Sequence, residues 1–204
     1  MKLYLIRHGV TDQNKERCLQ GRSDIELNEE GRELARKTAE GLKNIEFDLI
    51  FTSPLKRAYE TAEIIKGERD IPLILSEELL EISFGAYEGL CFGQENYNIP
   101  DADFMNFFNK PQEYKTPPEG ESFEQVIART GALLQELKGN SQYQNKTILL
   151  STHGCALKAI LANISKVSIE DFWGEGVHKN CAVSLVELQG DEFVLVEEGK
   201  VYYS

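Results

Sequence analysis

Short apolar runs alternate with helical patterns along most of the chain, and this alternation limits the folds that are open to it. Strands are predicted at residues 3–6, 48–52, 71–75 and 147–150. Helices are predicted at residues 29–43, 53–66, 122–137 and 156–163. Strands that alternate with helices are typical of a largely parallel sheet with helices on both faces. We therefore expect a single α/β domain over residues 1–204, built as a three-layer α/β/α fold.

Polar residues mark where several of these helices begin. Asn28 precedes one helical pattern, and its side-chain oxygen can accept a bond from a free backbone N–H. Ser53 is followed by Pro54, a residue favoured at the first helical position, so Ser53 is expected to be an N-cap. Ser122 opens the clearest helical pattern, in which apolar residues recur at three- and four-residue spacing.

Two segments depart from the alternation. Residues 182–188 and 192–196 flank Gln189-Gly190-Asp191, which predicts a C-terminal hairpin. The segment of about residues 90–121 is rich in proline and carries the aromatic residues Phe92, Tyr97, Phe104, Phe107, Phe108 and Tyr114. We interpret it as a small cap insertion over one edge of the sheet, because long loops are often functional. The alternative is a packed surface segment without a ligand role.

Two of the three histidines follow predicted strands. Arg7-His8-Gly9 comes directly after residues 3–6, and His153-Gly154 closely follows residues 147–150. Arg57 lies about one turn into the helix that follows a third strand. Ligands of open α/β sheets bind beyond the carboxyl ends of the strands. We therefore expect two imidazoles and two guanidiniums to converge at one edge of the sheet.

These groups together suit the transfer of a phosphoryl group. Guanidinium groups match phosphoryl oxygens in pairs and stay charged at any working pH. A neutral imidazole can attack phosphorus and hold the group covalently, while a second imidazole stabilises the transition-state oxygens. Glu81 is a candidate proton donor to the leaving alkoxide, because its apolar flanks favour the protonated form. No metal and no cofactor is expected, since the arginines already neutralise the phosphoryl charge.

Five sequence blocks resemble, in order, those of the phosphoglycerate-mutase-like branch of the histidine phosphatase superfamily. The first holds Arg7-His8-Gly9, Thr11, Asn14, Gln20-Gly21-Arg22-Ser23-Asp24 and Leu27-Asn28-Glu29-Glu30-Gly31; the others are Phe51-Thr52-Ser53-Pro54-Leu55-Lys56-Arg57-Ala58 with Thr61-Ala62, Leu79 with Glu81 through Gly89, Pro118 with Gly120-Glu121-Ser122, and Ser151-Thr152-His153-Gly154. The resemblance covers nearly the whole chain.

The resemblance implies a role for each matching residue. His8 is implied to be the nucleophile that becomes phosphohistidine, and Glu81 the proton donor that later activates water. The phosphoryl group is implied to be bound by Arg7, Arg57 and His153, with help from Asn14, Gln20 and the backbones of Gly21 and Gly154. The usual motif has Glu or Gln where this chain has Val10, a departure that concerns substrate contacts rather than the chemistry.

The net charge and the cysteine content limit the partners and the cellular location that we expect. With 22 Lys+Arg against 34 Asp+Glu, the net charge is −12, which disfavours nucleic acid and anionic membranes as partners. No apolar run approaches the roughly 20 residues of a membrane span. The four cysteines are scattered without a C-x-x-C pair, so we expect reduced structural thiols rather than a disulfide or zinc site, and a cytoplasmic location. A homodimer is compatible with the sequence, which leaves the oligomeric state open.

Three classes of function fit these residues: a phosphatase, a mutase and a binding module without turnover. A phosphoglycerate mutase needs cations for the substrate carboxylate, but the insertion offers only Lys110 and Lys115. The complete catalytic set argues against a binding module. We predict a metal-independent phosphomonoester hydrolase of moderately broad specificity. The alternatives are a cofactor-dependent phosphoglycerate mutase and a dedicated α-ribazole phosphatase of cobalamin synthesis.

Overall fold

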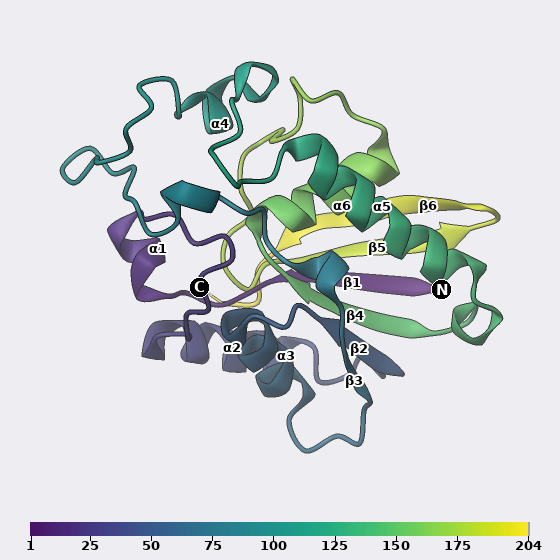
Figure 1. Cartoon of the computed structure of the whole chain (residues 1–204). Coiled ribbons are helices and arrows are strands. Elements are labelled where there is room, and N and C mark those ends of the chain that lie inside the picture. Colours follow the sequence, from purple (N-terminus) through teal and green to yellow (C-terminus); the bar gives the residue numbers. More distant parts are fainter. Residues whose placement is uncertain (204) are drawn as a thin grey trace.

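The computed structural model describes residues 1–203, which form a six-stranded sheet in the order β3-β2-β4-β1-β5-β6 (Figure 1). The strands are β1 (Lys2–Arg7), β2 (Leu49–Thr52), β3 (Leu73–Leu75), β4 (Thr147–Thr152), β5 (Val183–Gln189) and β6 (Glu192–Lys200). The first four are parallel to one another, whereas β5 and β6 are added antiparallel. The predicted parallel sheet and C-terminal hairpin are confirmed.

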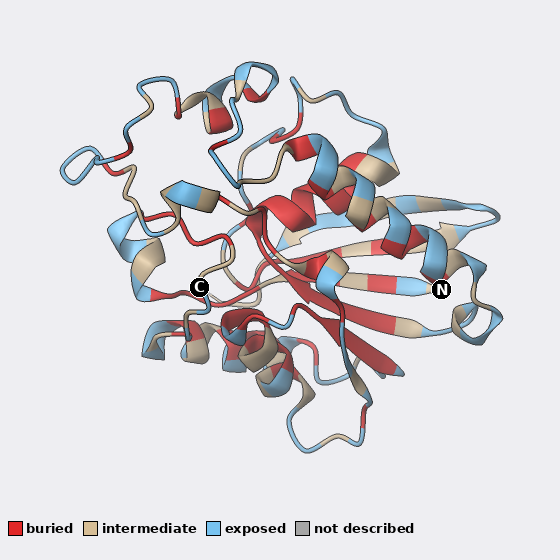
Figure 2. Ribbon diagram, in the orientation of Figure 1, coloured by how far each residue is buried: buried red, intermediate tan, exposed pale blue. Residues whose placement is uncertain are grey.

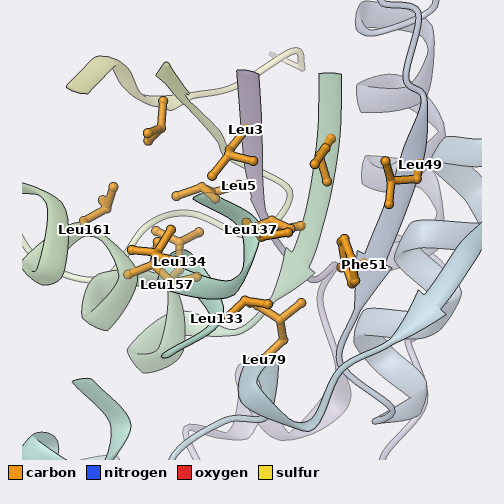
Figure 3. Close-up of a cluster of buried hydrophobic side chains, with 14 residues drawn as sticks. Leu3, Leu5, Leu49, Phe51, Leu79, Leu133, Leu134, Leu137, Leu157 and Leu161 are labelled. Atoms are coloured by element: carbon orange, nitrogen blue, oxygen red, sulfur yellow. The ribbon is translucent and has the colours of Figure 1, made fainter. Parts of the chain in front are cut away.

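Helices cover both faces of the sheet, as expected. The helices are α1 (Asp12–Glu16), α2 (Glu29–Gly41), α3 (Lys56–Lys66), α4 (Asn106–Asn109), α5 (Phe123–Gly139) and α6 (Gly154–Ser165). Figure 3 shows leucines of α5 and α6 packed against β1 and β2 on one face. Residues of α2 and α3 pack with Ile6, Ile50 and Leu149 on the other face. Figure 2 shows the result: the central strands are largely buried, and much of β6 is exposed.

The strand register fixes where the candidate site lies. Arg7 pairs with Thr152 across β1 and β4, and Thr52 pairs with Ser151 across β2 and β4. Three parallel strands therefore end level with one another. The residues that follow them, His8 among them, meet at one edge because parallel strands bring their carboxyl ends together.

The helix starts agree with the sequence in two places and differ in one. Asn28 caps α2 by accepting a bond from Gly31 N at 2.9 Å, and Ser122 caps α5 in a capping box. The start predicted at Ser53 and Pro54 was wrong, because α3 begins at Lys56. The Lys56 N–H is bound instead by Asp24 Oδ1 at 2.7 Å, so a distant loop supplies the cap.

The insertion of residues 90–121 contains α4 and shares an aromatic cluster with residues outside it. Phe107 is 2% exposed, and its ring contacts those of Phe84, Phe123 and Trp173 at centroid distances of 5.1–5.2 Å. Figure 1 shows this segment at the end of the sheet opposite to the N-terminus, which is the end where the parallel strands finish. Aromatic packing thus attaches the insertion beside the candidate site.

The expectation of four reduced thiols was wrong. Cys18 and Cys91 form a disulfide across 73 residues of sequence, whereas Cys155 and Cys181 are free and buried. The two bonded cysteines face one another in an isolated antiparallel bridge, which is flanked by backbone bonds between Leu19 and Leu90 and between Arg17 and Phe92. Spacing along the chain cannot reveal this pair, because the fold alone places the insertion beside the end of α1.

Alkylation of the unfolded, unreduced protein is expected to modify two of the four cysteines, and peptide mass spectrometry identifies which ones. Reduction is expected to lower the free energy of unfolding by about 2–4 kcal/mol, because the cross-link restricts the unfolded chain. The fully reduced protein, with four modified cysteines, is the reference. Modification of all four cysteines without reductant would show that Cys18 and Cys91 are not bonded.

No helix among residues 1–203 is both long and apolar enough to cross a membrane.

Candidate active site

His8 lies directly after β1 with its ring buried. Its Nδ1 is 2.6 Å from the carbonyl oxygen of Gly9, which makes Nδ1 the protonated nitrogen and leaves the lone pair of Nε2 free. The turn is held by Thr61, whose Oγ1 accepts from Gly9 N, and by Asn180, whose amide donates to the carbonyls of His8 and Gly9. Burial and the charge of Arg57 lower the pKa of His8 well below its ordinary value. His8 is therefore neutral near pH 7, as a nucleophile requires.

His153 follows β4 and lies beside His8, with ring centroids 5.2 Å apart. It is fully buried, and its Nε2 is 2.8 Å from the hydroxyl oxygen of Ser53. Burial, followed by the charge of Arg57, also lowers the pKa of His153 well below its ordinary value. The ring is therefore neutral and carries one proton, which one of its two nitrogens donates.

Arg57 and Arg7 flank the histidines. Arg57 is fully buried on α3, where it donates to the carbonyl oxygens of Gln20, Gly21 and Ser23 at 2.7–3.0 Å. Burial lowers its pKa to about 10, so it remains charged at neutral pH. Arg7, the last residue of β1, donates from Nη1 to the carbonyl oxygen of His178. Both guanidiniums are thus anchored by backbone carbonyls, and among residues 1–203 neither of them forms an ion pair with a carboxylate.

Both backbone groups of Gly21 are hydrogen-bonded within the protein. Its N–H is 3.0 Å from Glu88 Oε2, and its carbonyl accepts from Arg57. Glu88 also accepts from the N–H groups of Arg22, Ser23 and Phe84. The structure therefore places Gly21 in the loop that orients Arg57. A side chain would not fit there, because an added Cβ would lie 2.1 Å from the carbonyl oxygen of Ile82.

Gln20, Asn14 and Gly154 line the same pocket. The Gln20 Oε1 accepts from the Thr11 hydroxyl at 2.8 Å. The other end of the Gln20 amide, the buried Nε2, therefore points away from Thr11. Asn14 closes a capping box with Thr11 at the start of α1. Gly154 is the first residue of α6, where the backbone N–H groups have no partner within the helix.

Several buried nitrogen atoms in this site have no hydrogen-bond partner among residues 1–203. They are Arg7 Nε, Gln20 Nε2, Arg57 Nε and His153 Nδ1. Buried polar groups are normally paired, so each such atom requires an explanation. All four belong to residues that the sequence assigned to one phosphoryl group. An anion bound among them would satisfy the arginine and amide donors at once.

Glu81 is buried, but its surroundings differ from those expected. Its carboxylate accepts from the backbone N–H groups of Ile82, Cys155 and Ala156 at 2.9–3.0 Å, two of them at the N-terminus of α6. The apolar neighbours in sequence do not surround the carboxylate, because the start of α6 lies against it. Glu81 lines the pocket together with Arg7. This position is required of a residue that exchanges a proton beside a phosphoryl group.

Three residues of the site were not assigned a role from the sequence. Thr61 and Ser53 lie in the second of the five sequence blocks, but the sequence predicts only a helix cap for Ser53 and no role for Thr61. For Ser53, its place directly after β2 was an available signal, because His8 and His153 follow strands in the same way. For Asn180, which lies in an irregular segment before β5, no sequence signal was available.

The pocket beside these groups has a volume of about 380 Å³. One wall is aromatic, formed by Phe84, Phe92, Phe107, Phe108 and Trp173. The cations along its lining are Arg7 and Arg17, and the guanidinium of Arg17 lies 5.5 Å from the centre of the Phe92 ring. Among residues 1–203, no three His, Cys, Asp or Glu side chains are grouped as metal ligands.

Residues 3–200 match the sequence profile of the histidine phosphatase superfamily (branch 1), a range that includes His8, Glu81 and His153. The chain is 35% identical over 161 residues to a Bacillus subtilis protein named uncharacterized phosphatase PhoE, covering 79% of this chain and 76% of the relative.

Solved structures with the same fold are also similar in sequence. YhfR of Bacillus stearothermophilus matches with a TM-score of 0.89 at 34% identity, covering 98% of this chain and 97% of that one. A phosphoserine phosphatase of Entamoeba histolytica, solved with 3-phosphoglyceric acid, matches with a TM-score of 0.83 at 30% identity, covering 98% and 97%.

Proposed function

The chain belongs to the histidine phosphatase superfamily and is an enzyme of its phosphatase type, and we propose that it hydrolyses phosphomonoesters through a phosphohistidine at His8. One observation carries the proposal: His8, a neutral histidine whose Nε2 lone pair is free, lies beside His153 and near the charges of Arg57 and Arg7, whose Nε atoms are buried and have no partner among residues 1–203. Those donors suit the oxygens of one phosphoryl group, and the lone pair suits attack on its phosphorus.

In the first step, His8 Nε2 forms a bond to phosphorus while the bond from phosphorus to the ester oxygen breaks. Arg7, Arg57 and His153 bind the phosphoryl oxygens as negative charge shifts among them. Glu81 gives a proton to the leaving oxygen.

In the second step, water attacks phosphorus and the bond from phosphorus to Nε2 breaks. Glu81, now a carboxylate, takes the proton of that water, and its three backbone bonds stabilise the charge in the interval. The hydrogen bond from His8 Nδ1 to Gly9 holds the ring in one orientation through both steps. The proton that Glu81 gave to the leaving oxygen in the first step is thus replaced by the proton of the attacking water.

The aromatic wall favours substrates with an apolar or aromatic leaving group. Phe92 and Phe108 are half-buried and lie with ring centroids 5.3 Å apart, so they present apolar surface to the pocket. A phosphoglycerate mutase needs cations for the substrate carboxylate. Lys110 pairs with Glu113 and Lys115 with Asp103, and neither lysine lines the pocket. The insertion therefore supplies no lysine to the pocket, which supports hydrolysis over mutase activity.

Replacing Phe92 with alanine is expected to lower kcat/KM for aryl phosphates about tenfold, because burial of apolar surface is worth about 1.5–3 kcal/mol per large side chain. Phosphoserine, with a small polar leaving group, is expected to change less than about threefold. Steady-state kinetics on both esters checks this. Phe193→Ala is the matched control, since Phe193 is half-buried on β6 and lines a different hollow. An equal loss on both esters would contradict an aromatic leaving-group site.

Phosphate release from a panel of monoesters tests the function itself. The panel contains p-nitrophenyl phosphate, phosphoserine, 3-phosphoglycerate and α-ribazole phosphate, with EDTA present throughout. Release from several esters, highest for the aryl ester, is the expected result. Release from α-ribazole phosphate alone would identify a dedicated phosphatase. Interconversion of phosphoglycerates with added 2,3-bisphosphoglycerate, and no release, would overturn the proposal in favour of a mutase.

A further inference from the structure

The hydroxyl of Ser53 does not cap α3. Ser53 lies directly after β2, is fully buried, and its Oγ is 2.8 Å from Nε2 of His153. The backbone N–H of Leu55 donates to the same oxygen at 3.4 Å. These are the contacts of the Ser53 hydroxyl among residues 1–203. A cap at α3 is unnecessary, because Asp24 binds the first free N–H of that helix.

The bonding of this hydroxyl determines where the proton of His153 resides. The Leu55 N–H can only donate, so it uses an acceptor site of Oγ and leaves the hydroxyl hydrogen to another partner. Nε2 of His153 is the acceptor within reach. A neutral imidazole that accepts at Nε2 carries its proton on Nδ1.

We propose that Ser53 is a positioning residue that holds His153 with its proton on Nδ1, so that this nitrogen donates to the transferred phosphoryl group. Within residues 1–203, Nδ1 of His153 is buried and has no hydrogen-bond partner, and the same is true of Arg7 Nε and Arg57 Nε. Those two groups are donors in every protonation state. Nδ1 joins them as a donor only in the tautomer that Ser53 selects. The inference rests on the proposed function, since it assigns His153 Nδ1 to the same phosphoryl group.

The two active-site histidines thereby share one tautomer and use opposite nitrogens. In His8, the protonated Nδ1 is held by the Gly9 carbonyl and the bare Nε2 faces phosphorus. In His153, the bare Nε2 is held by Ser53 and the protonated Nδ1 faces the phosphoryl oxygens. The Gly9 carbonyl thus fixes the tautomer of the nucleophile His8. The Ser53 hydroxyl fixes the tautomer of His153, the imidazole that binds the phosphoryl oxygens. Without Ser53, either nitrogen of His153 could carry the proton.

Two-bond ¹H–¹⁵N spectra of the wild-type protein distinguish protonated from bare imidazole nitrogens and test the inference directly. The chain has three histidines, so His8→Gln, His153→Gln and His178→Gln variants assign the signals. His8 and His153 are both expected to carry the proton on Nδ1. A wild-type His153 with its proton on Nε2 would overturn the inference, and this measurement needs no Ser53 variant.

The Ser53→Ala variant is expected to move the His153 proton wholly or partly to Nε2 and to lower kcat about 10- to 100-fold, because one donor to the transition state is lost. KM is expected to change less. Ser53→Thr keeps the hydroxyl and is expected to restore both the tautomer and most of kcat. The matched control is Ser151→Ala, since Ser151 is equally buried at the end of β4 but donates to the Ala58 carbonyl. It is expected to keep the Nδ1 proton and kcat within about threefold.

Each outcome has one meaning. A Ser53→Ala protein that retains both the tautomer and kcat would overturn the role of Ser53. Should that variant not fold, the wild-type spectrum and Ser53→Thr still decide. Failure of the proposed function is recognised separately: in that case His8→Ala retains phosphatase activity, whatever the tautomer of His153.

Discussion

Replacing His8 with alanine is expected to lower kcat by at least about 10⁴-fold on every ester, because no other nucleophile lies at the end of β1. Binding of inorganic phosphate is expected to persist, since Arg7, Arg57 and His153 keep their anchors in the variant. Phosphate release measures the loss, and the thermal shift on adding phosphate shows that the variant is folded. Turnover at the wild-type rate would contradict attack by His8.

The same prediction has a positive readout in the wild-type protein. Turnover mixtures quenched with base are expected to contain protein phosphorylated at His8. The bond is a phosphoramidate, which is labile in acid and more stable in base, so the digestion is carried out in base. Phosphorylation of His8 that is absent from the His8→Ala protein separates covalent catalysis from simple binding. Phosphate on a different residue would reassign the nucleophile.

Replacing Glu81 with glutamine is expected to slow the hydrolysis of alkyl phosphates about 10²- to 10⁴-fold, because the alkoxide then leaves without a proton. Nitrophenyl phosphate is expected to lose much less, since nitrophenolate leaves readily as an anion. The dependence of log kcat/KM on the pKa of the leaving alcohol measures the difference, and it is expected to be steeper in the variant. Equal losses for alkyl and nitrophenyl esters would count against Glu81 as the acid.

The backbone contacts of Glu81 predict a cost in stability as well. Both carboxylate oxygens accept from N–H groups, and the amide of glutamine places an N–H₂ group where one oxygen was. The free energy of unfolding is expected to fall by about 1–3 kcal/mol for the unmatched donors. Glu78→Gln is the control, because Glu78 is a neighbouring carboxylate that bonds the Ser76 hydroxyl. Urea unfolding of both variants compares them.

The order of the elements and the two histidines could be predicted from the sequence because their signals are local. Apolar runs mark β1 and β4, and a residue that follows a parallel strand must lie at the carboxyl edge of the sheet. The level register of Arg7 with Thr152 and of Thr52 with Ser151 then brings His8, His153 and Ser53 together.

The tertiary structure alone decided which partner each polar group takes. Gly21 contacts Arg57, Asn180 holds the turn at His8, and the hydroxyl of Ser53 reaches His153, each across at least 36 residues of sequence. The bond between Cys18 and Cys91 belongs to the same class. Periodicity along a chain specifies which face of an element is apolar, but a hydrogen bond or disulfide depends on where distant segments meet. The sequence therefore determined the edge of the sheet where catalysis was to be sought, and packing determined the proton positions and anchors that make its residues a site.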